Sequence, residues 1–293
     1  MPRTFSSGNQ DPWISKIQRA LNEIIYSDLV TDGQFGESTK HALQDWQLTF
    51  KLEPTGLYEG RTAEILDAYI QERFLVDQDY ANAAKKMNVV TPAVRAVTEV
   101  EAKGSGFLST GRSTILFERH IFYKELNKRL DSTPTLVEDL YRKLKLTKPP
   151  TGSAVEYLKS HLLSNYSNLY NPSTGGYQGT AKGIEYEWQR MEKAKSIDNE
   201  SALLSVSYGL FQIMGFNYKA AGFKTVDEMY TACARSERNQ LDAFCNFVLA
   251  DKRLIIALRN NDFLNFAIAY NGPAQRGYDL KLSQAFNKWN GKC

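Results

Sequence analysis

The apolar positions in the first 75 residues follow a helical spacing that two similar turns interrupt. The segments GQFGEST (33–39) and GLYEGRT (56–62) each place a glycine, then an aromatic residue, then a threonine at the same spacing. Glycine permits the positive φ of a tight turn, and the aromatic ring fills that turn. Before them, four apolar residues recur at helical steps: Trp13, Ile17, Leu21 and Ile24. We therefore predict three short helices joined by two similar loops.

The remainder of the chain is also mainly helical in pattern. Residues 67–88 are polar and contain no proline or glycine, which favours a helical connector over a flexible tether. We place the domain boundary in this connector, giving domains 1–75 and 76–293. The clearest interruption of the second domain is NPSTGGYQGTAKG (Asn171–Gly183), a segment rich in turn formers, after which the helical pattern resumes at IEYEWQRMEKAK.

One predicted helix ends in two glutamates that are one residue apart. Thr91 suits the N-cap of this helix, and Pro92 suits its first turn. Four residues then share one face of the helix: Val90, Val94, Val97 and Glu101. Glu99 points about 160° away from Glu101, one turn after Arg95, with which it could form a surface ion pair. We therefore predict that Glu101 faces inward and Glu99 faces solvent.

Glu101 is the first candidate for acid–base chemistry. A partly buried carboxyl loses solvation, which raises its pKa toward the range that a general acid near neutral pH requires. Gly104 and Gly106 allow a sharp turn beside it and leave room for a cleft. Spacing alone leaves the alternative open that Glu101 is an ordinary solvated residue at a helix end.

Glu118 is the second candidate carboxylate. It follows the apolar run ILF in STILFERH (113–120), the one stretch whose composition suits a short sheet, with Leu116, Glu118 and His120 on one side. Glycosidic hydrolysis uses one carboxyl to protonate the leaving oxygen and a second to activate water or stabilise the sugar cation. The alternative is a structural ion pair between Glu118 and Arg119 or a nearby lysine.

Two further segments combine small, aromatic and amide residues. They are SVSYGLFQIMGFNY (Ser205–Tyr218) and AYNGP (Ala269–Pro273). Aromatic rings stack on sugar faces, and amides hydrogen-bond hydroxyl and N-acetyl groups. The candidate substrate-binding residues are Tyr208, Gln212, Tyr270 and Asn271. Taken alone, each segment is more often a helix start or a turn than a sugar-binding site.

Composition and charge narrow the class of protein only slightly. Aromatic residues make up 12% of the 293 residues, as in globular proteins, and the net charge is +3. Residues 1–75 hold 7 Lys and Arg against 11 Asp and Glu, whereas the remainder holds 29 against 22. A basic larger part could favour an anionic polymer such as nucleic acid or bacterial cell wall, but solvated surface charge explains it equally well.

Metal and cofactor chemistry find no support in the sequence. The three histidines are scattered without zinc-ligand spacing, and neither a phosphate-binding glycine loop nor a Gly-x-Ser-x-Gly motif occurs. The three cysteines form no disulfide framework, so we expect inert thiols. The chain has no apolar signal segment at its start and no apolar run of about 18 residues. We expect synthesis in a cytoplasm, no cofactor, no bound metal and no stable membrane insertion.

The first domain resembles the peptidoglycan-binding module found at the ends of cell-wall hydrolases. The likeness spans roughly residues 10–70 and is centred on DGQFGESTKHALQDWQLTFKLEPTGLYEGRT. Ten residues match the family pattern: Asp32, Gly33, Phe35, Gly36, Thr39, Ala42, Leu43, Gln47, Thr55 and Gly56. The resemblance implies a wall contact on the first loop, at Asp32, Gly33, Phe35, Gly36 and Thr39.

The second domain resembles the lysozyme-like N-acetylmuramidase domain of modular phage endolysins, over about residues 85–290. The segments AVTEVEAKGSGFLSTGRSTILFERHIFYKEL and SVSYGLFQIMGFNYKAAGF carry the likeness. It implies that Glu101 is the general acid and Glu118 the partner carboxylate. The sequence departs from the family pattern at Ala102 and Lys103, where small polar residues are usual, and at Tyr208, where tryptophan is usual.

Together these observations predict a mainly α protein with a small three-helix wall-binding domain and a lysozyme-like α+β domain containing a short β-hairpin. The expected function is that of an endolysin that hydrolyses the β-1,4 bond between N-acetylmuramic acid and N-acetylglucosamine for host cell lysis. The alternatives are a lytic transglycosylase that forms 1,6-anhydro products, or a non-catalytic wall-binding protein. The expected partner is peptidoglycan rather than nucleic acid, and the expected state is a monomer. It would be made in the host cytoplasm and reach the periplasmic wall after membrane permeabilisation.

Overall fold

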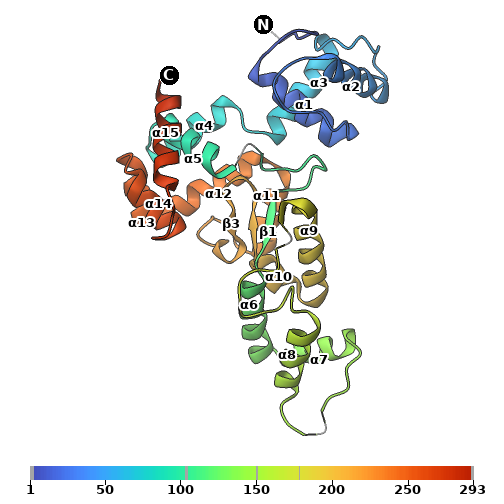
Figure 1. Ribbon diagram of the computed structural model, residues 1–293, viewed down its shortest axis with the longest axis vertical. Helices are drawn as coiled ribbons and strands as arrows, with labels where there is room; N and C mark the ends of the chain where they lie inside the picture. The colour runs from blue at the N-terminus through green and yellow to red at the C-terminus, as the bar shows by residue number, and fades with distance from the viewer. Residues whose placement is uncertain (1–2, 103–104, 150, 178, 292–293) are drawn as a thin grey trace.

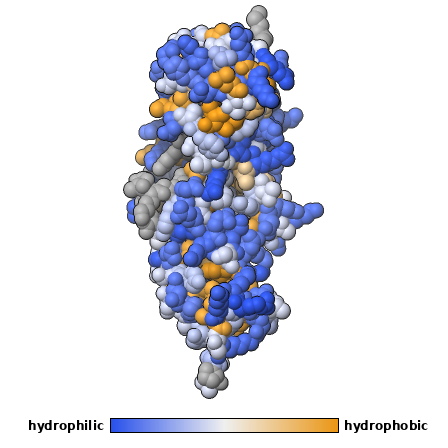
Figure 2. All heavy atoms as spheres, turned by 90° about the vertical axis from the view of Figure 1, so that its right-hand side faces the viewer, coloured by the Kyte–Doolittle hydropathy of each residue, from blue (hydrophilic) through white to orange (hydrophobic). Residues whose placement is uncertain are grey.

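The computed structural model describes residues 3–102, 105–149, 151–177 and 179–291. These residues are mainly helical with one small sheet, which confirms the predicted fold class. Figure 1 shows an elongated molecule, with the N-terminal module at one end and helices α7 and α8 at the other. Figure 2 shows a face on which hydrophilic residues predominate, with several separate apolar patches. None of the helices described is long and apolar enough to cross a bilayer.

The N-terminal module contains the three predicted helices: α1 (Pro12–Ile25), α2 (Glu37–Thr49) and α3 (Gly60–Arg73). Helix α1 begins where predicted from its apolar spacing, because the Asp11 carboxylate caps it by accepting a 2.7 Å hydrogen bond from the Trp13 backbone N–H. Pro12 occupies the first turn, where no backbone donor is needed. The chain leaves α1 through Tyr26 in the left-handed conformation.

A buried glutamine organises each of the two similar loops. The Gln18 carboxamide accepts a hydrogen bond from the Gly33 N–H at 3.0 Å and donates to Asp32 Oδ1 at 2.9 Å and Thr39 Oγ1 at 3.1 Å. Gln47 makes the equivalent bonds to the glycine and threonine 23 residues further on, at 2.9 and 3.0 Å. One glutamine side chain thus pairs with both a donor and acceptors of the turn, which would otherwise lack hydrogen-bond partners. This explains the repeat in physical terms.

The connector is helical but broken. Helix α3 ends at Arg73, and α4 (Asp77–Met87) begins after three extended residues. The apolar cores also change at this point: Phe74 packs in the core of the N-terminal module, and Leu75 packs in the larger core. The boundary at residue 75 stays our proposal, since Phe107, from far along the chain, also belongs to the core of the module.

The larger part consists of eleven further described helices, three strands and two 3₁₀ turns. The helices are α5 (Thr91–Ala102), α6 (Arg119–Ser132), α7 (Pro134–Lys143), α8 (Ala154–Asn165), α9 (Gly179–Ile197), α10 (Asn199–Leu204), α11 (Val226–Arg235), α12 (Glu237–Ala250), α13 (Lys252–Arg259), α14 (Phe263–Asn271) and α15 (Tyr278–Asn290). Helix α9 begins inside the segment predicted to be a loop. Helix α15 packs along α5, so the end of the chain lies beside the helix that carries Glu101 (Figure 1).

The sheet is antiparallel, in the order β1 (Ile115–Phe117), β2 (Val206–Tyr208), β3 (Ile213–Met214). Ile115 pairs with Tyr208, and Ser207 pairs with Met214. Strands β2 and β3 form a short hairpin, as the predicted fold class requires, joined by the 3₁₀ turn η1 (Gly209–Phe211). Strand β1 lies in residues 113–120, where the sequence suggested the sheet, whereas β2 and β3 lie outside that stretch. All three residues of β2 are buried, so the strand shows no alternation of polar and apolar positions.

Candidate active site

Glu101 lies in the last turn of α5. Val94 and Val97, which share its face, are completely buried, so the face assignment is confirmed at these positions. Val90 was wrongly included, because it precedes the helix and its side chain is 49% exposed. The helix itself begins at Thr91, one residue earlier than predicted, with the Ala93 N–H donating to the Val90 carbonyl.

The Glu101 carboxyl is partly buried against α14 and α15. The Tyr278 hydroxyl, from the start of α15, donates a hydrogen bond to Glu101 Oε1, and the Asn271 side chain, at the end of α14, also bonds to the carboxyl. Burial raises the pKa of Glu101 above its usual value, and the two hydrogen bonds oppose that rise. Burial and the neighbouring carboxylate raise the pKa of Tyr278 well above its usual range, so this hydroxyl stays a donor.

Glu99 faces outward as predicted, but with a different partner. Its carboxylate lies 2.9 Å from Lys288 Nζ and accepts a 2.8 Å hydrogen bond from Trp289 Nε1. The expected pair with Arg95 is not formed, since the Arg95 guanidinium contacts Asp77 at 2.8 Å. Sequence spacing could not show that α15 packs beside this face and supplies the nearer cation.

Glu118 stands at the junction between β1 and α6. Its backbone N–H donates to the Ser205 carbonyl at 2.8 Å, and its carbonyl accepts the first hydrogen bonds of α6. The Tyr177 hydroxyl donates to its carboxylate at 2.5 Å. His120 Nδ1 lies 3.3 Å from the same oxygen, close enough for an ion pair when protonated but not aligned as a hydrogen bond. Burial, then this bond to Glu118, raises the pKa of Tyr177 to about 12.

Two expectations about this segment are corrected. The strand ends at Phe117, so Glu118 caps a helix and His120 belongs to that helix rather than to the strand. Arg119 does not pair with Glu118: its guanidinium donates to the carbonyls of Ser167, Ser173 and Thr174 in the loop before α9. The Glu118 carboxylate is thus held by a tyrosine hydroxyl with an imidazole nearby, which leaves it able to act as a base or nucleophile.

The four candidate sugar-binding residues have different positions. Tyr208 is 2% exposed and its hydroxyl donates to the Leu203 carbonyl at 2.8 Å, so its ring packs in the core and cannot stack on a sugar. The Gln212 amide donates to the Gly209 carbonyl at 2.8 Å and holds the β2–β3 turn. The Tyr270 hydroxyl donates to the Phe211 carbonyl at 2.8 Å. Asn271 is exposed and lies beside Glu101.

The predicted wall-binding residues divide into buried and exposed ones. Phe35 and Thr39 are 1% and 2% exposed, so their side chains build the loop and cannot reach a glycan. Gly33 is buried with a φ of 77°, and a Cβ there would lie 3.0 Å from the Asp11 carbonyl oxygen. Asp32 and Gly36 are exposed and stay candidates for wall contact. The residues of the matched motif therefore mainly maintain the structure of the turn, and few of them are placed to contact the wall.

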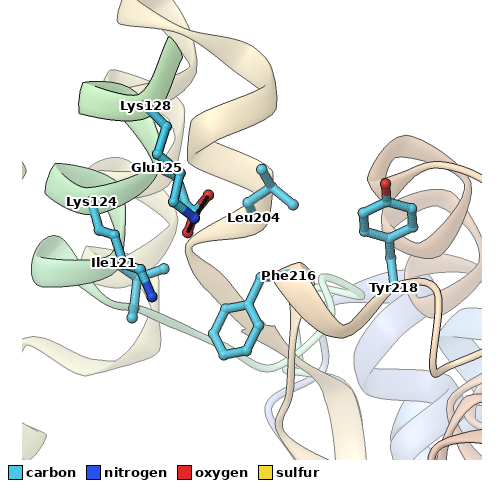
Figure 3. A pocket seen from close by; sticks show the side chains of 7 residues that line it. All are labelled: Ile121, Lys124, Glu125, Lys128, Leu204, Phe216 and Tyr218. Carbon is cyan, nitrogen blue, oxygen red and sulfur yellow. Dashed lines mark hydrogen bonds and ion pairs between the residues drawn. The ribbon is translucent and has the colours of Figure 1, made fainter. Parts of the chain in front are cut away.

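A pocket of about 380 Å³ opens beside α6. Seven residues line it: Ile121, Lys124, Glu125, Lys128, Leu204, Phe216 and Tyr218. Figure 3 shows the four α6 side chains facing Leu204 and Phe216, with Tyr218 farther from α6. Ile121 follows Glu118 by about one helical turn, although Glu118 itself does not line the pocket.

The two cysteines that the structure describes take no part in this site. Cys233 lies on α11 and Cys245 on α12, and both are buried free thiols. Burial raises the pKa of each to about 12, so both stay protonated. Cys293 lies outside the described residues. Within the part of the chain that the structure describes, no three His, Cys, Asp or Glu side chains gather as metal ligands.

Two functional partners were missed from the sequence. Tyr278 reaches Glu101 across 177 positions, and Tyr177 reaches Glu118 across 59. Neither tyrosine stands in a motif, although Tyr177 lies in the loop already noted for its turn formers. Only the packing of α15 on α5, and the path of the loop before α9, bring these hydroxyls to the carboxylates.

Comparison with known proteins identifies the family of each part of the chain. The family described as N-acetylmuramidase matches residues 90–290, and the putative peptidoglycan binding domain matches residues 10–66. Among solved structures, the "Crystal structure of Burkholderia AP3 phage endolysin" is 35% identical, with 99% of both chains covered and a TM-score of 0.61. No curated protein matches. The chain therefore belongs to the N-acetylmuramidase family of glycoside hydrolases, with a peptidoglycan-binding domain ahead of the muramidase domain.

Proposed function

We propose that this protein is an endolysin that cleaves the β-1,4 bond between N-acetylmuramic acid and N-acetylglucosamine in peptidoglycan. The observation that carries the proposal is the partly buried Glu101, whose pKa is raised by burial while a tyrosine and an asparagine hold its orientation. A carboxyl of this kind retains a proton closer to neutral pH than an exposed one. The phage endolysin of similar structure supports the biological role.

Glu101 acts as the general acid. The Tyr278 hydroxyl occupies Oε1, so the proton for transfer resides on Oε2 and passes to the leaving glycosidic oxygen as the bond breaks. Asn271 is exposed beside the same carboxyl, where its amide can also bond an N-acetyl or hydroxyl group of the sugar. This is the one of the four proposed substrate contacts that lies directly beside Glu101.

Glu118 provides the second carboxylate. The Tyr177 hydroxyl donates to one of its oxygens, which fixes the group and leaves the other oxygen for chemistry. In that position it either stabilises the oxocarbenium-like sugar or activates the attacking water. The presence of this second, positioned carboxylate favours hydrolysis over transglycosylation, which can proceed with one glutamate.

The pocket beside α6 is proposed to take the stem peptide of the muramic acid. Ile121 and Phe216 offer an apolar floor, and Lys124 and Lys128 stand on its rim, where a peptide carboxylate would be attracted. Lys128 is already paired with Glu125 at 2.8 Å, so Lys124 is the more effective cation. The pocket would therefore favour a glycan that carries stem peptides over a bare chitin-like glycan.

The N-terminal module binds the wall and keeps the enzyme near its substrate, an effect of local concentration. Asp32 and Gly36, on the exposed side of the first loop, are the proposed contacts. We further propose that the enzyme acts as a monomer without a nucleic-acid partner. In this scheme it accumulates in the host cytoplasm and reaches the periplasmic wall once the membrane is permeabilised.

The decisive test compares Glu101→Gln with Glu99→Gln on purified peptidoglycan. Glu101→Gln should lower kcat about 10²- to 10⁴-fold, since it removes the transferable proton but keeps the acceptor for Tyr278. Glu99→Gln, two positions away on the exposed face, should stay near wild type. An equal loss of kcat in both variants would refute the assignment of Glu101 as the general acid.

Product analysis separates the rival functions. Mass spectrometry of the released muropeptides should show reducing N-acetylmuramic acid ends. Anhydro ends would identify a transglycosylase instead. A wild-type protein that sediments with the wall without lowering its turbidity would be a binding protein only.

A further inference from the structure

Residues 105–111, which lie between the two glutamates in the sequence, are held by contacts with the N-terminal module. Phe107, in this segment, is 4% exposed and packs in the core formed by α1, α2 and α3. The Arg73 guanidinium, at the end of α3, lies 3.4 Å from the centre of the Phe107 ring. The same guanidinium donates a hydrogen bond to the Gly111 carbonyl. An aromatic side chain of the catalytic part thus completes the core of the binding module.

Arg73 is itself rigidly placed. Its Nε donates to the Glu23 carboxylate at 2.9 Å, and that carboxylate is 4% exposed. Its Nη1 donates to the carbonyls of Ala234 and Arg235, both at 2.8 Å, at the end of α11. One side chain of the module therefore ties the turn at Gly111 to the helical part of the catalytic domain.

A second contact holds the start of the segment. Arg19, on α1, donates to Ser105 Oγ at 2.9 Å and pairs with Glu237 Oε1. Glu237, on α12, is 3% exposed and accepts the Gly106 N–H at 2.9 Å and the Leu75 N–H at 3.0 Å. A buried carboxylate of this kind needs its cation, because the backbone donors alone do not neutralise it. Arg19 therefore completes the site that fixes Gly106.

The held segment leads directly to Glu118. It starts four residues after Glu101, and its Gly106 carbonyl accepts the Thr114 N–H at 2.9 Å. The Thr114 carbonyl accepts the Gly209 N–H at 2.7 Å, and β1 then pairs with β2 up to Glu118. The position of this segment therefore determines how β1 and its terminal glutamate stand relative to the end of α5.

We propose that the N-terminal module is a structural part of the catalytic centre: Arg19, Arg73 and the cavity for Phe107 position the segment between the two carboxylates and so fix their relative placement. The catalytic part of this inference rests on the proposed function. A module that served only as a tether would need none of these buried contacts. The separation of the two carboxylates decides whether water or the carboxylate attacks, so small displacements are costly to the rate.

Arg19 is the positioning residue to test, in the full-length protein. Arg19→Ala removes both contacts, and Arg19→Lys keeps a cation for Glu237. The matched control is Arg61→Ala in the same module, since Arg61 is 70% exposed and pairs within the module with Glu64 at 3.0 Å. Three quantities are measured: kcat and KM on a soluble tetrasaccharide of alternating N-acetylglucosamine and N-acetylmuramic acid, sedimentation with purified wall, and hydrogen exchange of the Gly106 amide.

We expect Arg19→Ala to lower kcat on the tetrasaccharide at least about tenfold with KM within about twofold, since misplacement by about 1 Å can cost 10²-fold. Gly106 should exchange faster, wall sedimentation should be unchanged, and Arg19→Lys should recover part of both effects. Arg61→Ala should match wild type throughout. Unchanged kcat together with unchanged exchange in Arg19→Ala would reduce the module to a tether and overturn the proposal.

Two further outcomes are also decisive. If wild type leaves the tetrasaccharide and the wall uncut, the proposed function fails, and the exchange of Gly106 still decides whether Arg19 holds the segment. If Arg19→Ala does not fold, Arg19→Gln removes the charge that pairs with Glu237 and keeps a side chain that fills part of the space. It should show the same direction of change in kcat and exchange. Wild-type values for both in that variant would refute positioning by Arg19.

Discussion

The hydroxyl of Tyr278 should control the pH range in which the enzyme works. It donates to Glu101 Oε1 and so stabilises the charged carboxylate, opposing the rise in pKa that burial causes. Tyr278→Phe removes this donor and keeps the ring that packs between α15 and α5. The pKa of Glu101 should therefore rise further. A general acid must be protonated, so kcat/KM falls as the pH rises through its pKa. The variant should thus move the alkaline limb of the profile to higher pH.

The size of the effect follows from the kind of bond. A hydrogen bond to a charged group contributes about 1.5–3 kcal/mol, and Asn271, which bonds to the same carboxyl, compensates for part of that loss. A difference of about 1.36 kcal/mol between protonation states moves a titration by one pH unit. The displacement should therefore be resolved by measurements at half-unit intervals.

The assay is the rate of reducing-end release from soluble peptidoglycan fragments between pH 4 and 9. Tyr141→Phe is the matched control, because the Tyr141 hydroxyl donates to the Ala154 carbonyl at 2.8 Å, away from both glutamates. Its profile should coincide with that of wild type. A limb in Tyr278→Phe that stays in place, or moves to lower pH, would contradict the assignment of Glu101 as the acid.

Three further predictions concern stability. Glu101→Gln should have a higher melting temperature than wild type, by a margin that grows from pH 4 to pH 8. The pKa of Glu101 is raised in the folded state, so its contribution to stability is full below the unfolded-state pKa and is lost as the pH rises through the folded-state pKa, whereas glutamine does not titrate. A margin that stays constant with pH in calorimetry would contradict this. Phe107→Ala should cost about 3–5 kcal/mol in urea unfolding, as a buried phenylalanine does, and an unchanged midpoint would show that the contact is dispensable. Gln18→Ala should cost about 1–3 kcal/mol by leaving the buried Gly33 N–H unpaired, with Gln71→Ala, at an exposed position of α3, as a near-silent control.

The sequence supported those features that depend on local pattern. Helical phase was enough to turn Glu101 inward and Glu99 outward, and paired turn motifs were enough to predict three helices. The positions of strands β2 and β3 were missed, because strands of three and two residues are too short to show alternation. The partners of both glutamates were beyond reach for another reason: each depends on packing between elements that are far apart in the chain. The prediction that Phe35 and Thr39 contact the wall failed for a third reason: both side chains are buried and maintain the turn, so they cannot reach a ligand.

The burial of Phe107 in the core of the N-terminal module has a consequence for chimeric lysins. A fusion that joins residues 76–293 to a foreign wall-binding module would leave a large aromatic ring facing solvent or a surface of the wrong shape. Such hybrids should be prone to aggregation even when both halves fold. A better transplant carries the first module together with the turn at residues 105–113, or replaces Phe107 and grafts Arg19 and Arg73 onto the incoming module. Exchange of the two domains at a boundary near residue 75 would therefore be a poor way to re-target this enzyme.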